Sequence, residues 1–325
     1  MPRLSFLFRT DVHLADKSPV SWKGDYMEEI LSDLDQIGKL AKLHDVTAVL
    51  DGGDYFHVKS SSKNPHYLNE KSANLHKLYP CPVYGVVGNH DMVYNSLDSV
   101  PTQPLGVLHA TGVIRDLHEE VFVDGSIQVR VVGVPYSPNR TLEELLAIRK
   151  KPGDTHLIAI VHSLASLKPP GSVADFWNEP VFPYESLITK NGPDCWNFGH
   201  WHKDQGIEVI EGRYFVNQGA VSRGALVREN LERVPKVALL DFDGGTLSVT
   251  PIPLSVAPAS DVFDLEKKEL QEKERKDLDQ FVLRLVSDGE LDPDASIEDN
   301  IQGLEFASAV RSEALRYLEL VEASL

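Results

Sequence analysis

The chain has 325 residues, of which 42% are hydrophobic and 25% are charged, a composition typical of a globular protein with one large domain or two smaller ones. Its formal net charge of −17 excludes a protein that holds nucleic acid by a basic surface alone, so a phosphate-bearing substrate would need positive charge from metal ions or from a partner. Two widely separated cysteines and the lack of an apolar run of about 20 residues predict a cytoplasmic protein without a membrane segment.

In chain order, five short apolar runs predict strands, and each run is followed directly by a polar motif. The runs cover residues 4–8, 46–50, 83–87, 157–161 and 195–198. Near-continuous apolar runs of this length are typical of strands that are buried on both faces. The spacing of apolar residues predicts helices at about 27–41, 66–78 and 142–148. This alternation predicts an α/β fold in which ligands bind at the carboxyl ends of the strands.

The pattern changes after residue 205. Short strands are predicted at 207–210 and 214–217, followed by a hairpin with strands at 237–242 and 246–252. Prolines near residue 255 mark a boundary. We therefore expect a catalytic domain over 1–256, which residues 206–256 either complete or extend as a small cap. Beyond it, 261–325 predicts an acidic helical C-terminal extension, with 18 acidic and 8 basic residues, that either packs on the catalytic domain or docks a partner.

The polar residues that follow the predicted strands are of the kinds that bind metals. They are Asp11, His13, Asp54, His57, Asn89, His90, Asp91, His162, His200 and His202. The last two lie two residues apart, so in an extended segment both side chains point the same way, although alone they could equally be two solvated histidines. Ligands from Asp, His and Asn, without cysteine, favour Mn²⁺, Fe²⁺ or Zn²⁺ over Ca²⁺ or a structural zinc site.

Seven of these residues are candidate ligands, too many for one ion but enough for two ions that share a carboxylate. They are Asp11, His13, Asp54, Asn89, His162, His200 and His202. Asp54 is the natural shared ligand, because Gly52 and Gly53 before it let the backbone turn tightly and approach the ions. Two ions about 3.5–4 Å apart form a clamp for in-line displacement at phosphorus.

The order of these motifs resembles the calcineurin-like metallophosphoesterases. The motifs are Asp11-Val12-His13, Gly53-Asp54-Tyr55-Phe56-His57, Gly88-Asn89-His90-Asp91, His162 and Gly199-His200-Trp201-His202. The resemblance covers residues 1–225 and implies a two-sheet α/β sandwich flanked by helices, with a dinuclear site at one edge of the sheets.

The resemblance also implies a role for each motif residue. One ion would take Asp11, His13, Asp54 and His202, and the other would take Asp54, Asn89, His162 and His200. His90 would be the general acid toward the leaving oxygen, oriented by Asp91, although Asp91 could instead cap a turn. We expect two divalent ions, Mn²⁺ first, with Fe²⁺, Mg²⁺ or Zn²⁺ as alternatives.

Within the superfamily, the motifs G-G-D-Y-F-H and G-N-H-D are most similar to DNA double-strand-break repair nucleases of the SbcD type, including their phage relatives. This resemblance implies that His57 assists catalysis; the alternative is that it only supports Asp54. The implied function is a metal-dependent DNA nuclease, an exonuclease that hydrolyses phosphodiester bonds in repair, recombination or the processing of DNA ends. The alternatives are a phosphodiesterase or phosphatase for a small substrate and a non-catalytic scaffold.

The same resemblance implies partners and a compartment. The partners would be DNA, an SbcC-type coiled-coil ATPase that binds residues 261–325, and a second copy of the chain in a homodimer. The compartment would be the cytoplasm of a bacterium, for a bacterial protein or for a phage protein in its host.

Overall fold

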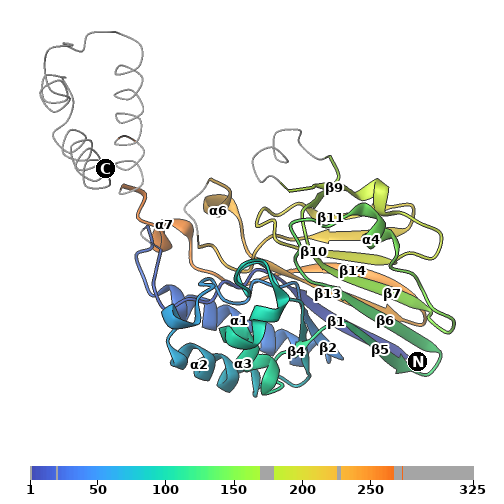
Figure 1. Cartoon of the computed structure of the whole chain (residues 1–325), viewed down its shortest axis with the longest axis horizontal. Helices are drawn as coiled ribbons and strands as arrows, with labels where there is room; N and C mark the ends of the chain where they lie inside the picture. The colour runs from blue at the N-terminus through green and yellow to red at the C-terminus, as the bar shows by residue number, and fades with distance from the viewer. Residues whose placement is uncertain (1, 20, 169–178, 225–227, 267–272, 274–325) are drawn as a thin grey trace, which may run out of the picture. The chain divides into compact units, whose positions relative to one another are not determined.

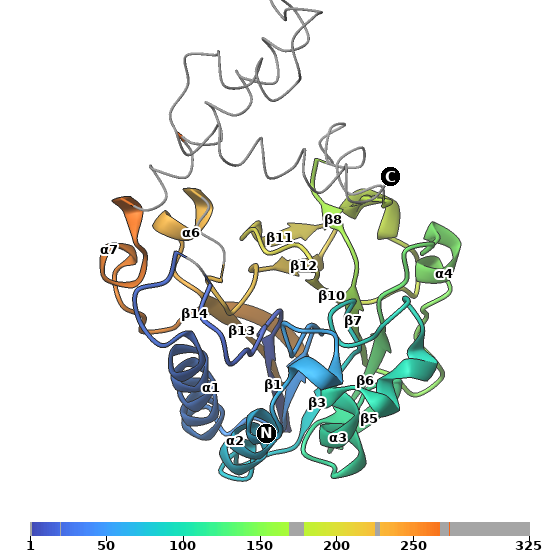
Figure 2. The same cartoon turned by 60° about the vertical axis from the view of Figure 1, so that its left-hand side comes forward.

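The apolar runs form strands in two mixed six-stranded sheets (Figure 1). The first sheet has the order β14 (Thr246–Pro253), β13 (Lys236–Asp243), β1 (Arg3–Arg9), β2 (Ala48–Asp51), β3 (Val83–Gly85) and β4 (Arg115–Asp116). The second has the order β11 (Gly206–Ile210), β12 (Arg213–Asn217), β10 (Cys195–Gly199), β7 (His156–His162), β6 (Ile127–Val134) and β5 (Glu119–Asp124). Strands β1 to β4 are parallel, as are β6, β7, β10 and β12, so within each set the carboxyl ends share one edge (Figure 2).

The computed structural model describes residues 2–19, 21–168, 179–224, 228–266 and 273. One compact unit covers Met1–Val262, and a second begins at Phe263. The predicted helical extension over 261–325, with its docking role, lies almost entirely outside the described residues. Within the described ranges, we find no helix that combines the length and the apolar character needed to cross a membrane.

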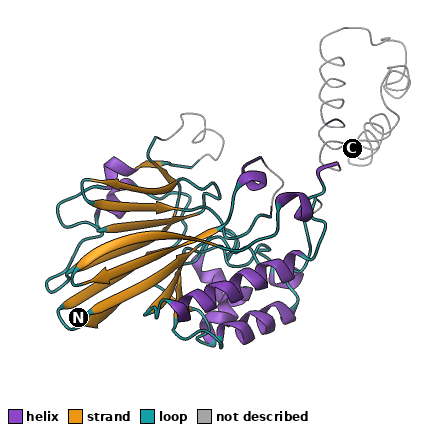
Figure 3. Ribbon diagram, turned by 180° about the vertical axis from the view of Figure 1, so that it is seen from behind, coloured by secondary structure: helices purple, strands orange, loops and turns teal. Residues whose placement is uncertain are grey.

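Both sheets are covered on both faces. Alternate residues of β1 divide between the two sides: Leu4, Phe6 and Phe8 pack between the sheets, whereas Leu7 faces the helices. Those helices are α1 (Tyr26–Leu43), α2 (His66–His76) and α3 (Pro104–Ala110), and α4 (Leu142–Leu146) packs on the outer face of the second sheet. The helices thus lie outside the strands (Figure 3), and burial on both faces explains the near-continuous apolar runs.

The shorter elements lie in the connections. They are β8 (Ala165–Ser166), β9 (Phe182–Pro183), α6 (Arg228–Glu232), α7 (Ala259–Val262), and the 3-10 turns η1 (Ser61–Lys63), η2 (Leu97–Thr102) and η3 (Tyr184–Leu187). The β8–β9 pair matters for the site, because β8 begins three residues after His162.

Most of the predicted elements are confirmed in type, with ends that shift by one or two residues. The strands after residue 205 lie at one end of each sheet: β11 and β12 extend the second, and β13 and β14 extend the first, with β11 and β14 at the edges. Neither the β5–β6 hairpin nor α3 was predicted from the sequence. In β6 the apolar run is interrupted by Arg130, which is buried because its Nε donates to Asp154 Oδ2 at 2.7 Å. A strand with an arginine in its middle is not a continuous apolar run, so the pattern used for the other strands does not predict it.

Candidate dinuclear metal centre

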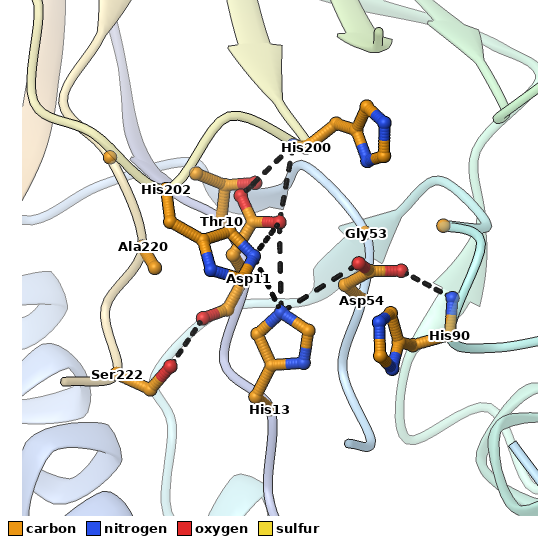
Figure 4. A network of polar contacts seen from close by, with 12 residues as sticks. Thr10, Asp11, His13, Gly53, Asp54, His90, His200, His202, Ala220 and Ser222 are labelled. Carbon is orange, nitrogen blue, oxygen red and sulfur yellow. Dashed lines mark hydrogen bonds and ion pairs between the residues drawn. The ribbon is translucent and has the colours of Figure 1, made fainter. Parts of the chain in front are cut away.

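The ten polar residues predicted from the sequence meet at one edge of the sheets. They follow β1 (Asp11, His13), β2 (Asp54, His57), β3 (Asn89, His90, Asp91) and β10 (His200, His202), and His162 ends β7. Figure 4 shows six of them, with His13 directed at Asp11, Asp54 and His202.

The first cluster consists of Asp11, His13, Asp54 and His202, whose possible ligand atoms all lie within 4.8 Å of one another. The Nε2 atoms of His13 and His202 are 2.9 Å apart. Two imidazole nitrogens that share an ion at about 2.0–2.1 Å lie about 2.9–3.4 Å apart for angles between 90° and tetrahedral. The carboxylates complete the group: Asp11 Oδ1 is 3.6 Å from His202 Nε2, and Asp54 Oδ2 is 3.7 Å from His13 Nε2.

The second cluster consists of Asp54, His162 and His200, whose ligand atoms also lie within 4.8 Å. Asn89 adds an oxygen, since its Oδ1 is 3.2 Å from His162 Nε2. Asp54 belongs to both clusters through one atom, because Oδ2 lies 3.5 Å from His162 Nε2 as well as 3.7 Å from His13 Nε2. The residues therefore fit a pair of divalent ions with Asp54 between them, bound by oxygen and nitrogen ligands.

The backbone at four of these ligands is strained. Asp11, His13, Asp54 and His200 have φ angles of 52°, 49°, 56° and 81°, and together they are four of the nine non-glycine residues with positive φ in the described ranges. Left-handed φ is uncommon outside glycine and costs on the order of 1–3 kcal/mol for each residue. Strain of this kind persists only where surrounding contacts fix it, and it concentrates at functional sites.

Two glycines let the loops approach each other closely. A Cβ atom on Gly88 would collide with Oδ1 and the backbone nitrogen of Asp54. Gly53 has a φ of 97°, and a Cβ atom there would lie 2.7 Å from Nδ1 of His162. Both positions therefore require glycine, and both touch a predicted ligand.

Backbone groups orient the ligand side chains. The His162 Nδ1 atom lies 2.6 Å from the Gly52 carbonyl oxygen, so this nitrogen carries the proton and Nε2 faces Asp54 and Asn89. The His200 amide donates to both carboxylate oxygens of Asp11 at 3.1 Å. A protein carbonyl or amide thus fixes the direction of each of these ligands before an ion arrives.

Asp91 supports the loops rather than the His90 ring. Its Oδ2 accepts from the backbone nitrogens of Asp54 at 2.8 Å and Gly88 at 2.9 Å, and its Oδ1 accepts from that of Tyr55 at 3.0 Å. This arrangement corresponds to the alternative in which Asp91 caps a turn. The ring that it was expected to orient, that of His90, is oriented by a different group.

His90 and His57 form a pair beside His13. The two rings stack with centroids 5.4 Å apart and an interplanar angle of 19°, and His90 Nδ1 lies 2.6 Å from the His57 carbonyl oxygen. The ligand atoms of all three histidines lie within 4.8 Å of one another. Because the carbonyl can only accept, Nδ1 of His90 carries a proton, and Nε2 is the nitrogen at which the ring can give or take a second one.

Burial and neighbouring charges shift the pKa values of three ligands, and the direction differs between the two histidines. Burial opposes protonation of His162, yet the adjacent Asp54 outweighs it and raises the pKa of His162 to about 9, so an ion that binds this ring must displace a proton. Burial would raise the pKa of Asp54, but the His162 and His13 imidazoles hold it well below its usual value. Burial, followed by the neighbouring His202, lowers the pKa of His13 well below its usual value, which keeps that ring neutral and able to bind a metal.

Three further residues, which were not predicted from the sequence, hold the ligand loops in place. Arg9 ends β1 and is fully buried with Asp51, which ends β2; Arg9 Nε donates to Asp51 Oδ2 at 2.7 Å. Asp51 Oδ1 in turn accepts from the Gly53 amide at 3.0 Å. Thr10 donates to Asp11 Oδ2 at 2.7 Å. A charged residue at the end of an apolar strand was the signal available for Arg9 and Asp51.

A further pair, Glu179 and Tyr136, also escaped the sequence analysis. Glu179 Oε2 lies 3.0 Å from His200 Nε2, and the Tyr136 hydroxyl donates to Glu179 Oε1 at 2.6 Å. Neither residue belongs to a motif that carries the resemblance, so no sequence signal pointed to them.

Solved structures match this chain at low sequence identity and with TM-scores below 0.5. A presumed 5′-nucleotidase of Staphylococcus aureus, in complex with α-ketoglutarate, is 15% identical with a TM-score of 0.48, over 85% of this chain and 59% of the other. The sulfate thiohydrolase SoxB of Thermus thermophilus, in complex with glycerol, is 13% identical with a TM-score of 0.45, over 77% and 56%. This chain thus spans little more than half of these two proteins. The calcineurin-like phosphoesterase YfkN of Bacillus subtilis is 13% identical with a TM-score of 0.42, over 80% and 91%.

These similarities are too low to carry an argument about substrate. No curated protein sequence matches the chain at a significant level. A family model does match: the model of the calcineurin-like phosphoesterases covers residues 4–204, more than half of the chain, and includes every motif described above. The chain therefore belongs to the calcineurin-like phosphoesterase family.

Proposed function

We propose that this protein is a metal-dependent DNA exonuclease that hydrolyses phosphodiester bonds during repair, recombination or the processing of DNA ends in a bacterial cytoplasm. Membership of the phosphoesterase family supports the reaction class. The resemblance of the G-G-D-Y-F-H and G-N-H-D motifs to SbcD-type nucleases supports the substrate. Within the structure, the observation that supports the proposal most directly is a large cleft beside the first cluster.

The cleft has a volume of about 1290 Å³, and its lining includes His13, His57 and His202, so it opens onto the candidate metal centre. Pockets that enclose a small ligand usually measure roughly 300–1,000 Å³. A cleft above that range favours a polymer that continues past the reacting phosphate over a nucleotide that must be enclosed. This comparison favours the nuclease over the small-substrate phosphatase.

Two lysines give the cleft positive charge in an otherwise acidic chain. Lys17 and Lys63 both line it and are exposed, and neither forms an ion pair with any residue that the structure describes. Asp16 is the acidic residue of the same lining. Ammonium groups in the lining of the cleft would bind phosphates of a nucleic-acid strand that lies in it and so position that strand.

The chemistry assigned to the chain follows from its own groups. When bound, a pair of divalent ions supplies Lewis acidity toward the phosphodiester and lowers the pKa of an attacking water, and ligands of oxygen and nitrogen suit Mn²⁺ in that role. The His57 carbonyl keeps a proton on Nδ1 of His90, so a second proton at Nε2 is the one that His90 delivers to the leaving oxygen. Asp91 holds the two loops that carry Asp54 and His90 in register.

A substrate panel tests the proposal. Purified protein with Mn²⁺ is offered linear duplex DNA, single-stranded DNA, a nucleoside monophosphate and bis-p-nitrophenyl phosphate. We expect cleavage of DNA from its ends and hydrolysis of the model diester. Hydrolysis of the monophosphate with no cleavage of either DNA would establish the small-substrate alternative instead.

The cleft lysines give a second, sharper test. Replacing Lys17 and Lys63 together by Ala removes two phosphate contacts, so the slope of log affinity for DNA against log salt should fall by about 1.4–1.8. Turnover of bis-p-nitrophenyl phosphate, which carries no second phosphate for the lysines to bind, should stay unchanged. Lys42→Ala, on the exposed end of α1 and outside the cleft, is the matched control. If the double variant had the same salt slope as the wild type, the cleft would not be the DNA-binding site.

We further propose that residues 261–325 recruit an SbcC-type ATPase, whose surface would add basic DNA contacts to those of the two cleft lysines. Val262 and Phe263 are 6% and 0% exposed, so a truncation has to leave them in place. A chain ending at Asp264 should keep Mn²⁺-dependent hydrolysis of the model diester and lose the ATPase in a pull-down. Retention of the ATPase by the truncated chain would contradict this assignment.

A further inference from the structure

A row of three side chains runs outward from the second metal cluster. His200 Nε2 lies 3.0 Å from Glu179 Oε2, and Glu179 Oε1 accepts from the Tyr136 hydroxyl at 2.6 Å. The glutamate thus uses one oxygen for the histidine and the other for the tyrosine. All three groups are withdrawn from solvent: the side chains of His200 and Glu179 are 4% and 17% exposed, and Tyr136 is 7% exposed.

The fold holds both partners of His200 in place. Glu179 lies three residues before Phe182, the first residue of β9, which pairs with Ala165 of β8 and donates its backbone N–H to the Leu164 carbonyl at 3.0 Å. Since β8 follows closely on His162, the pairing of β9 with β8 places Glu179 beside His200.

Tyr136 is tied to the other ligand loop. Its backbone N–H donates to the Val87 carbonyl at 2.8 Å, two residues before Asn89. Its ring lies against both histidines of the second cluster, with centroids 5.2 Å from His200 and 6.1 Å from His162. The tyrosine therefore has a fixed backbone, a packed ring and a directed hydroxyl, and it fixes one oxygen of Glu179.

We infer that Glu179 and Tyr136 are a positioning pair that fixes the His200 ring for the second ion of the proposed dinuclear centre. A carboxylate on the far nitrogen of a metal-binding imidazole sets its tautomer and orientation and makes it a stronger ligand. The Glu179 carboxylate accepts from Nε2 of His200, which places the lone pair of that ring on Nδ1. Tyr136 keeps the carboxylate from rotating away.

This inference rests on the proposed dinuclear centre and has two rivals. Glu179 could itself bind the ion, or the contact could matter only for the local packing. The hydroxyl of Tyr136 tests the packing rival, because it hydrogen-bonds Glu179: if the contact matters only for packing, loss of the hydroxyl leaves the second ion unaffected. A His200→Ala background tests the other rival. If Glu179 acts through His200, Glu179→Ala has no further effect on the second ion in that background, whereas a Glu179 that binds the ion itself still weakens it.

The test measures Mn²⁺ binding to the full chain, by calorimetry for the two affinities and by electron paramagnetic resonance for the coupled pair of ions. Glu179→Ala should weaken the second ion by about 10–100-fold, the usual scale for such outer partners, and should leave the first unchanged. Tyr136→Phe should weaken it in the same direction by a smaller factor. Glu185→Ala, an exposed glutamate nearby, is the matched control and should leave both affinities unchanged.

Two results would contradict the positioning role of Glu179 and Tyr136. An unchanged second affinity in Tyr136→Phe, with melting temperature preserved, overturns the positioning pair, and so does an unchanged affinity in Glu179→Ala. Glu179→Gln keeps the shape of the side chain and guards against misfolding of the alanine variant; it should also weaken the second ion, because the charge is lost. Two ions bound by the wild type without any cleavage of DNA would refute the proposed function alone and leave this inference standing.

Discussion

Replacing Asp91 by Asn separates two roles for this carboxylate. In the structure, Oδ2 accepts from the amides of Asp54 and Gly88 at 2.8 and 2.9 Å, and Oδ1 accepts from those of Tyr55 and Phe56 at 3.0 and 3.3 Å. An asparagine has one acceptor oxygen, and its amide nitrogen cannot accept. In either orientation of the new side chain, therefore, two buried backbone N–H groups lose their partner.

The size of the effect follows from those two contacts. Asp91 is 1% exposed, so no water replaces the lost acceptor. Leaving a buried N–H group without an acceptor costs about 1–3 kcal/mol, so leaving two should cost about 2–6 kcal/mol of unfolding free energy. For a chain of this size, with an unfolding entropy of about 0.7 kcal/mol/K, a cost of that order lowers the melting temperature by at least about 3 °C. The strained Asp54 loop loses two of its anchors, so Mn²⁺ binding and activity should fall as well.

Thermal unfolding of the Asp91→Asn chain, followed by circular dichroism, measures this cost. Asp98→Asn, an exposed aspartate a few residues further along, is the control and should stay within about 0.5 kcal/mol of the wild type. If Asp91 acted instead by orienting His90, the variant would lose activity with its melting temperature and its Mn²⁺ binding intact. That result would refute the anchoring role.

Three further predictions concern single side chains. Asp54→Asn should abolish hydrolysis and reduce bound Mn²⁺ measured by atomic absorption, because one carboxylate oxygen serves both clusters; full occupancy with full activity would contradict the shared ligand. His90→Ala should keep both ions and lose about 10²–10⁴-fold in rate, the scale of a general acid, and loss of an ion would make it a ligand instead. Burial, followed by the nearby charge of Glu29, raises the pKa of Asp33 to about 8. The folded state therefore favours the protonated carboxyl. Its stabilising contribution is fully present below the unfolded pKa near 4 and is lost as the pH rises to 8. Asp33→Asn should therefore raise the melting temperature at pH 8 and not at pH 4, and an equal effect at both would exclude titration of Asp33 as the cause.

Much of the sandwich could be predicted from the sequence because its strands are buried on both faces. Such strands read as continuous apolar runs, and each run delivers a polar motif to the same edge of a parallel sheet. The β5–β6 hairpin was not predicted because β6 is not a continuous apolar run. Arg130 sits inside β6 and is neutralised by Asp154, a residue 24 positions away, so its burial depends on a partner that periodicity does not reveal.

The sequence by itself also determined which residue types could bind metal, since Asp, His and Asn at strand ends carry the right atoms. Only the tertiary structure decided how they are held. The partners of Asp91 are backbone N–H groups, which every non-proline residue possesses and no sequence motif marks. Glu179 reaches His200 through the pairing of β8 with β9, and Tyr136 reaches Glu179 from the end of β6. Positioning contacts of this kind join segments that are distant in the chain, and their geometry exists only once the sheets have formed.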